Sequence, residues 1–140
     1  MANYLDDLIT EKFATLVDDI AKDAICQIPS YRQAPLRLTI QRVERWLTAV
    51  ADSIRQNNPE ILESHLKQVA AERQEEGYAI AELHAIVQIT ERHLHAVVLR
   101  SEATEAEHNA NLALLDVVMD AARMVLSVTY VLYAQGRRAR

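Results

Sequence analysis

The sequence contains almost no glycine, and this scarcity limits what the chain can fold into. Only 2 of its 140 residues are glycine, which is about a fifth of the usual share. Sheet-rich folds need glycine at their tight turns, and doubly wound α/β folds need it in their phosphate-binding loops. Alanine, leucine, isoleucine, valine, glutamate, glutamine and arginine make up most of the rest, and most of these residues suit helices. The composition therefore predicts an all-α fold.

Apolar residues recur along the chain at steps of three and four, which is the spacing of amphipathic helices. The pattern predicts one domain over residues 1–140, built as a bundle of five helices. These helices are expected at residues 4–28, 35–57, 58–76, 79–100 and 101–133. The last residues, 136–140, are expected to form a basic frayed tail or a junction to a further domain.

The expected helix ends depend on proline, asparagine and glycine signals. Pro29 ends the first helix and opens a connection over residues 29–35. Asn58 is expected to cap the third helix, with Pro59 at its first position. Gly77 provides the left-handed residue that stops this helix. For the last helix the sequence offers Ser101 or Thr104 as cap, and Ser101 is preferred because it leaves the shorter loop.

The last predicted helix is apolar almost all the way round from residue 112 to residue 133. A helix of this kind is buried on most sides. It is therefore either the central helix of the bundle or one side of a homodimer, and the sequence favours the homodimer. Val118, Val125 and Leu132 are the candidate interface residues. Asp120 and Arg123 would then line a wet seam or cross the symmetry axis.

Charge and cysteine content exclude several classes of protein. The formal net charge of −5 argues against non-specific nucleic-acid binding, which needs a basic surface. The nearest candidate for a transmembrane helix, residues 124–135, has about half the length needed to span a membrane. The N-terminus has no signal-peptide pattern, and Cys26 is the single cysteine, so no internal disulfide can form. We therefore expect a cytoplasmic protein without membrane or nucleic-acid partners, in which Cys26 is a small buried residue.

No catalytic, cofactor or metal site is predicted. His84, Glu91 and His95 share one face of the fourth predicted helix. Glu91 and His95 are four residues apart and could share a metal ion, but a third ligand is not evident nearby. A solvated polar face explains them more simply, and they remain the first candidates if the protein were an enzyme. Glu105 and His108 form a single Glu-x-x-His pair, whereas a di-iron bundle needs two.

The second predicted helix is basic, and its neighbours in sequence are acidic. Complementary packing of adjacent helices accounts for this pattern. The alternative is an anion site built by Arg32, Arg37 or Arg73.

Two stretches together resemble a known family. The first runs from Ile28 to Arg32, with Pro-Leu at 35–36, and the second is the segment 71–83, where Arg73 precedes Gly77 and a Glu-Leu pair. Together they resemble the N-terminal sensory domain of the co-antagonist proteins of the bacterial stressosome, which also precedes kinases and PucR-like regulators. The resemblance implies an all-helical cytoplasmic module, usually dimeric and without catalysis of its own.

Four residues of these motifs are candidates for a ligand site or for a structural corner, namely Tyr31, Arg32, Arg73 and Tyr78. The sequence thus predicts a non-catalytic bacterial signalling module, which dimerises and acts as a sensor or partner-binding input domain for a downstream signalling domain or protein. The alternative is a helical bundle that holds a small apolar ligand between its helices. No cofactor is expected in either case.

Overall fold

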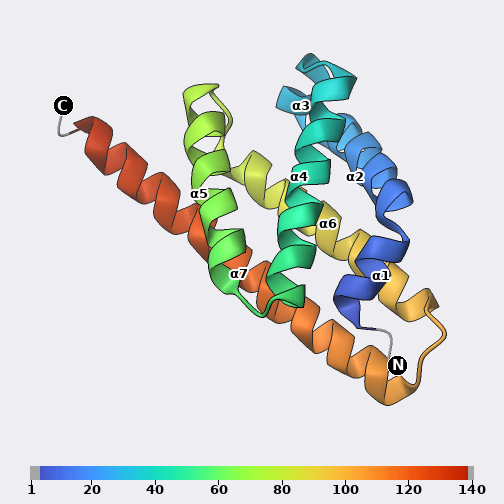
Figure 1. Ribbon diagram of the computed structural model, residues 1–140. Coiled ribbons are helices and arrows are strands. Elements are labelled where there is room, and N and C mark those ends of the chain that lie inside the picture. Colours follow the sequence, from blue (N-terminus) through green and yellow to red (C-terminus); the bar gives the residue numbers. More distant parts are fainter. Residues whose placement is uncertain (1–3, 139–140) are drawn as a thin grey trace.

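The computed structural model describes residues 4–138, and all its regular elements are helices (Figure 1). The predicted all-α fold is confirmed for this range. The predicted number of five helices is wrong, because seven are present. They are α1 (Leu5–Glu11), α2 (Phe13–Gln27), α3 (Pro29–Gln33), α4 (Leu36–Arg55), α5 (Pro59–Glu75), α6 (Ile80–Arg100) and α7 (Glu105–Arg138).

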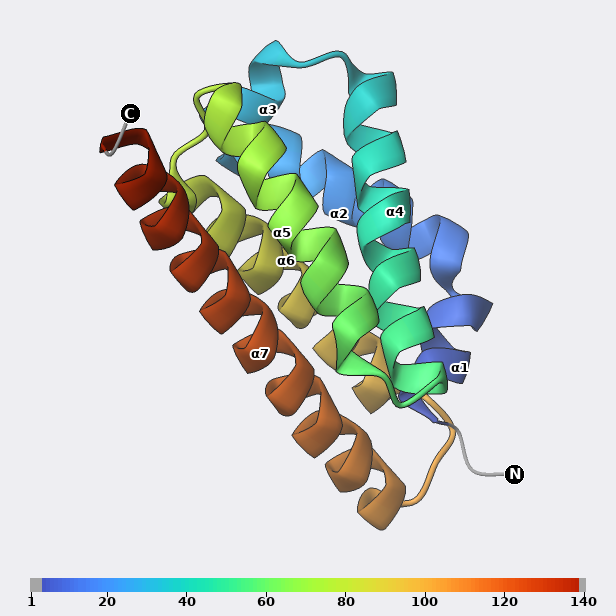
Figure 2. The same cartoon turned by 60° about the vertical axis from the view of Figure 1, so that its left-hand side comes forward.

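The five longest helices form a closed ring around one hydrophobic core. Going round it, α7 packs against α5, α5 against α4, α4 against α2, α2 against α6, and α6 against α7 again. Figure 2 shows α4 and α5 diverging from their short connection, with α6 behind α5. The core takes side chains from every long helix. Its largest fully buried members are Leu5, Ile9, Ile20, Ile28, Leu47, Ile89, Leu94, Leu115, Met119 and Leu126.

The first predicted helix is divided at Lys12 into α1 and α2. In a continuous helix Lys12 would lie on the same face as Ile9 and Leu16, which are both buried. A lysine on that face must reach water with its ammonium group. The backbone departs from helical geometry at Lys12, and its side chain is exposed. The apolar periodicity continues across this break, which is why it predicted a single helix.

Helix α3 is the other helix that the sequence did not predict. It occupies most of the expected connection over residues 29–35. Pro29 stands at its first position, where the fixed φ of proline suits a helix and no backbone donor is lost. Tyr31 points into the core from this short helix and is 5% exposed. The proline therefore ends α2 and also starts α3.

Two of the predicted helix ends are confirmed. The side chain of Asn58 accepts a hydrogen bond from the backbone N–H of Glu60 at 3.1 Å, so it caps α5. Gly77 has a φ of +90°. The next backbone N–H, that of Tyr78, then reaches the carbonyl oxygen of Arg73 at 2.9 Å. This is the arrangement that a glycine just after a helix permits.

The start of the last helix differs from the prediction, because Thr104 rather than Ser101 is its cap. The hydroxyl of Thr104 accepts from the backbone N–H of Glu107, and a carboxylate oxygen of Glu107 accepts from the N–H of Thr104. This reciprocal pair satisfies two backbone donors that a helix start leaves free. Ser101 instead ends α6, with its hydroxyl on the carbonyl oxygen of Val98.

Helix α7 has about the predicted length, but it begins at residue 105 instead of 101 and ends at residue 138 instead of 133. It has 34 residues, a length of about 51 Å. In Figure 1 it crosses the whole molecule and its C-terminal end projects beyond α5. Residues 136–138 of the predicted tail or junction still belong to the helix; residues 139–140 lie outside the described range. In the described part of the chain, α7 and the other helices lack the apolar length that a membrane crossing requires.

Candidate functional site

Three of the four motif residues meet at one corner of the ring. The rings of Tyr31 and Tyr78 are 5.4 Å apart in an edge-to-face arrangement. Arg73 belongs to the last turn of α5, and its side chain is only 7% exposed. The fourth residue, Arg32, is exposed on α3. The structure therefore groups Tyr31, Arg73 and Tyr78, and Arg32 lies on the surface beside them.

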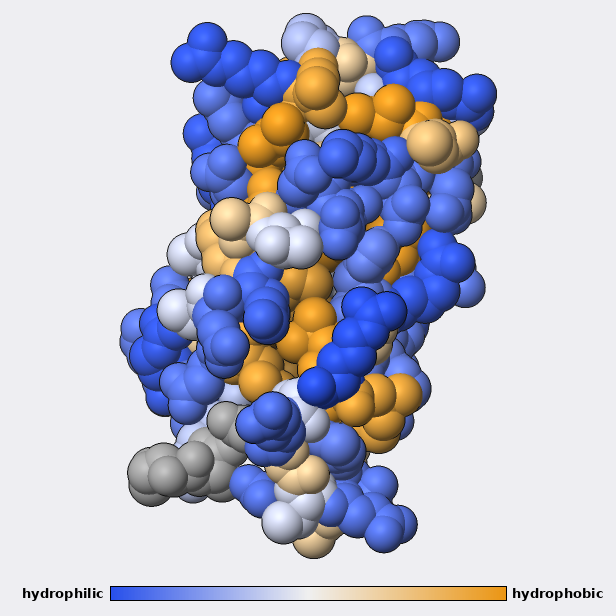
Figure 3. Space-filling view, turned by 90° about the vertical axis from the view of Figure 1, so that its right-hand side faces the viewer, coloured by the Kyte–Doolittle hydropathy of each residue, from blue (hydrophilic) through white to orange (hydrophobic). Residues whose placement is uncertain are grey.

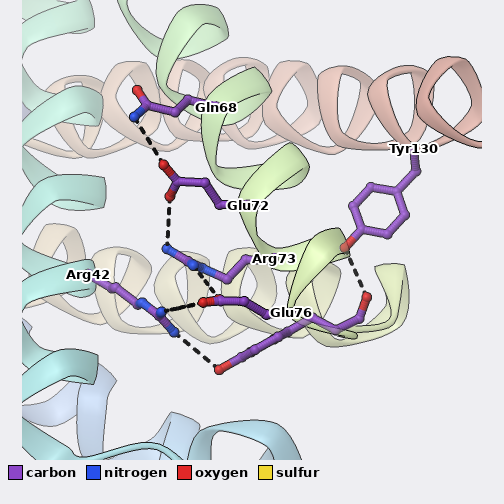
Figure 4. Close-up of polar contacts among 7 residues, drawn as sticks. Arg42, Gln68, Glu72, Arg73, Glu76 and Tyr130 are labelled. Atoms are coloured by element: carbon purple, nitrogen blue, oxygen red, sulfur yellow. Dashed lines mark hydrogen bonds and ion pairs between the residues drawn. The ribbon is translucent and has the colours of Figure 1, made fainter. Parts of the chain in front are cut away.

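The sequence analysis missed Arg42, which completes this corner from α4. Its guanidinium donates to the hydroxyl of Tyr78 at 3.2 Å and to a carboxylate oxygen of Glu76 at 3.0 Å. Arg73 donates to the other oxygen of Glu76 at 2.5 Å (Figure 4). One carboxylate thus joins two arginines from different helices. Arg42 borders the apolar stripe of α4, next to Val43, but nothing in the sequence pairs it with a residue 34 positions away.

The corner is also fastened to α7 and α3. The hydroxyl of Tyr130 donates to the carbonyl oxygen of Tyr78 at 3.1 Å. The carboxylate of Glu82 accepts from the backbone N–H groups of Ser30 and Ala79. Burial alone would raise the pKa of Glu82, but these hydrogen bonds outweigh it and lower the pKa. Five helices, α3 to α7, are therefore joined by polar contacts within a few residues of Gly77.

A cavity of about 90 Å³ lies beside this corner, between α4 and α5. Leu83, Ile86 and Val87 of α6 and Leu126 of α7 also line it. Its walls are mostly apolar, and Arg42, Arg45, Arg73 and Glu72 also line it. Its lining includes Val43, Arg45, Trp46, His65, Val69 and Leu126.

Trp46 and His65 form one wall of the cavity. Their rings stack with centroids 6.4 Å apart. The indole N–H donates to the hydroxyl of Thr90 at 2.8 Å, which fixes the orientation of Trp46. Burial, helped by the charges of Arg45 and Arg73, lowers the pKa of His65 below its ordinary value. The imidazole is therefore neutral near pH 7.

The second candidate region is the outer face of α7. Six of the nine large hydrophobic residues that are exposed in the described chain lie on this helix. Most of them form a line with alternating steps of three and four residues, which we call the outer stripe. The outer stripe consists of Leu114, Val117, Ala121, Met124, Val128 and Val131.

The outer stripe points directly away from the core of its own chain. The opposite side of α7 is buried and carries Leu115, Met119, Ala122 and Leu126. On a helical wheel with a seven-residue repeat, Val117, Met124 and Val131 lie opposite these buried positions. Val117 and Met124 are accordingly 65% and 68% exposed. No other element of the described chain covers this line of side chains.

The three interface residues predicted from the sequence lie at the edge of this stripe. Val118 and Val125 are half-buried and pack against the core of their own chain, whereas Leu132 is exposed. Arg123 forms an ion pair with Glu91 of α6 and a second with Asp120 at 2.9 Å. The expected placement of Arg123 in a wet seam is therefore replaced by an ion pair within the chain.

His84, Cys26 and Arg37 are the remaining candidate residues. His84 lies 3.1 Å from the hydroxyl of Ser127, so the polar face of α6 contacts α7 instead of being fully solvated. No group of three metal-binding side chains occurs among the described residues. Cys26 is exposed, so its predicted burial is wrong: it lies on the side of α2 that faces away from the buried Ala21 and Ala24. Arg37 is exposed and lies outside the lining of the cavity.

The opposite side of the molecule, which carries α1 and α2, has a different surface. Figure 3 shows that hydrophilic side chains cover most of it, and that apolar surface appears only in broken strips between them. The uninterrupted apolar line of α7 thus has no counterpart on this face (Figure 3).

Comparisons with protein family models, with curated proteins and with solved structures give no significant match. The resemblance to the stressosome sensory domain therefore stays a prediction, which depends on the two motifs alone.

Proposed function

We propose that this protein is a non-catalytic interaction module of bacterial signalling, which forms a homodimer through the outer stripe of α7. The outer stripe is the single observation that carries this proposal. The resemblance of the 28–36 and 71–83 segments to a sensory domain supports the signalling role, a cytoplasmic location and a downstream signalling partner.

Exposure of the outer stripe is costly for a monomer. Each aliphatic side chain of this size gains about 1.5–3 kcal/mol when it moves from water into an apolar environment. Contiguous apolar surface of this extent marks contact sites on soluble proteins. A second molecule that covered Val117, Met124 and Val128 would therefore be strongly stabilised.

The spacing of the outer stripe fits a second copy of the same helix. Alternating steps of three and four residues are the repeat by which two helices pack their side chains into each other. From Leu114 to Val131 the stripe extends over about 26 Å of helix. It contains no charged residue, so two copies face each other without repulsion. A symmetric dimer uses one self-complementary patch, and this stripe meets that requirement.

The test places charge in the stripe and measures the oligomeric state. Val117→Glu and Met124→Glu are combined, and sedimentation velocity is recorded at about 10 µM protein, a concentration at which a stable dimer stays associated. We expect the unmodified protein to be a dimer and the double variant to be a monomer with an unchanged far-UV circular dichroism spectrum. Two buried carboxylates on each subunit would be desolvated without partners.

The matched control introduces the same charge at exposed leucines outside the stripe. Leu36→Glu and Leu99→Glu alter residues of similar exposure on α4 and α6, and this variant should remain a dimer. An unmodified protein that sediments as a monomer contradicts the proposal. A dimer that survives Val117→Glu and Met124→Glu contradicts it equally, because the interface would then lie elsewhere.

A further inference from the structure

From the cavity between α4 and α5 we infer a binding site for a small carboxylate with a short, branched apolar tail. The tail would enter the cavity and the carboxylate would meet Arg45 at its mouth. This site is separate from the proposed dimer interface, because it meets α7 at the buried Leu126, on the face of that helix opposite the outer stripe.

The walls of the cavity determine the tail. Val43, Trp46 and Val69 present apolar surface to it, and Leu126 contributes from α7. An engineered cavity of about 150 Å³ holds benzene, or roughly 25 Å³ for each carbon atom. The volume of about 90 Å³ then suits about four carbon atoms by the same measure. Longer chains and fused rings would need the two helices to move apart.

The charges around the cavity determine the head group. Arg42 and Arg73 are occupied, because Glu76 bonds both and Glu72 lies 3.5 Å from Arg73. Arg45 also lines the cavity, is exposed, and has no ion-pair partner among the residues that the structure describes. One positive charge at the mouth is thus left to be matched by a ligand. A guanidinium binds a carboxylate through two parallel hydrogen bonds.

The lowered pKa of His65 agrees with an excess of positive charge around the cavity. The pKa of this histidine is lowered by burial first, and then by the charges of Arg45 and Arg73. Glu72 opposes this effect without cancelling it. An anion at the mouth of the cavity would therefore be attracted by the local potential.

A single negative charge fits better than a polyanion such as a phosphate ester. Glu72 lines the cavity, and Glu76 is bonded to Arg42 and Arg73, which also line it. A second or third negative charge on the ligand would face these carboxylates. The apolar walls below offer a doubly charged group no hydrogen-bond donors in compensation.

The test uses Trp46 as its reporter. It is the single tryptophan of the chain, so a change in tryptophan fluorescence reports the cavity wall. The probe is 3-methylbutanoate, whose tail has the inferred size. The comparison compounds are 3-methylbutanamide, which has the same skeleton without charge, and acetate, which has the charge without the tail. We expect 3-methylbutanoate to change the fluorescence with a Kd on the order of 1 mM, and both comparison compounds to bind at least about tenfold more weakly.

Two variants locate the binding. Arg45→Gln should weaken 3-methylbutanoate binding about tenfold and leave 3-methylbutanamide unchanged. The matched control Arg37→Gln alters an exposed arginine on the same helix that does not line the cavity, and it should have no effect. Val69→Phe should abolish binding by filling the space, with circular dichroism to verify the fold.

Several results would overturn the inference. One is the absence of any response to 3-methylbutanoate at about twenty times the expected Kd. Another is equal binding of acetate, which would show an unspecific anion effect. Unchanged affinity in Arg45→Gln would show that the carboxylate does not meet Arg45, and this surface variant decides the question even if Val69→Phe does not fold.

Discussion

The corner around Gly77 and the outer face of α7 differ in whether their side chains find partners within the chain. At the corner, Arg73 is almost fully buried, yet Glu76 and Glu72 neutralise it within the chain. On α7 the outer stripe leaves large apolar side chains in water with nothing in the described chain to cover them. The corner is complete in one subunit, whereas the outer stripe gains stability only from a second molecule.

The largest expected effect is a difference in unfolding free energy between substitutions on the two faces of α7. Leu126 is 2% exposed and Val128, two residues further on, is 52% exposed. We expect Leu126→Ala to lower the free energy of unfolding by about 3 kcal/mol, because it leaves a cavity in the core. Val128→Ala should change it by less than about 0.5 kcal/mol.

Urea unfolding of both variants should be measured in a Met124→Glu background, so that association does not contribute to stability. Equal losses in the two variants would mean that the outer stripe is already covered within its own chain. The difference between the faces of α7 would then disappear.

The corner is expected to be sensitive to charge. Glu76→Gln keeps the shape of the side chain but removes the anion between Arg42 and Arg73. Since Arg73 is buried and Glu76 is partly exposed, we expect a loss of about 1–2 kcal/mol in the free energy of unfolding. Chemical denaturation measures it, with the neighbouring exposed Glu75→Gln as the matched control. A loss as small as that of the control would show that the corner does not depend on this carboxylate.

A smaller effect concerns pH. Because the pKa of His65 is lower in the folded protein, the folded state binds fewer protons than the unfolded chain just below pH 6.5. Stability should therefore fall as the pH decreases through the ordinary histidine value and level off below the lowered pKa. His65→Gln should reduce this dependence.

The pKa of His65 itself can be followed by NMR titration. Arg45→Gln should raise it, because one repelling charge is removed, whereas Arg37→Gln should leave it unchanged. A His65 pKa that is the same in Arg45→Gln and in the unmodified protein would mean that Arg45 does not influence the cavity.

Local features of the fold could be predicted from the sequence. The scarcity of glycine indicated an all-α chain, and Asn58, Pro59 and Gly77 marked helix ends where the structure has them. These signals act on the backbone within a few residues, so the chain carries them without any tertiary contact. The break at Lys12 was missed for the opposite reason, since a short interruption leaves the apolar periodicity unchanged on either side.

Tertiary structure alone decided which residues meet and which stay exposed. The sequence pointed to Tyr31, Arg73 and Tyr78, but it could not supply Arg42, which arrives from a helix more than thirty positions away. It also showed that α7 is apolar on most sides, but not which side the rest of the chain would cover. Periodicity determines the angle between side chains on one helix, whereas the direction of the core depends on where the other helices pack. For this reason Val118 and Val125 lie against their own chain, and Val117 and Met124 face outward.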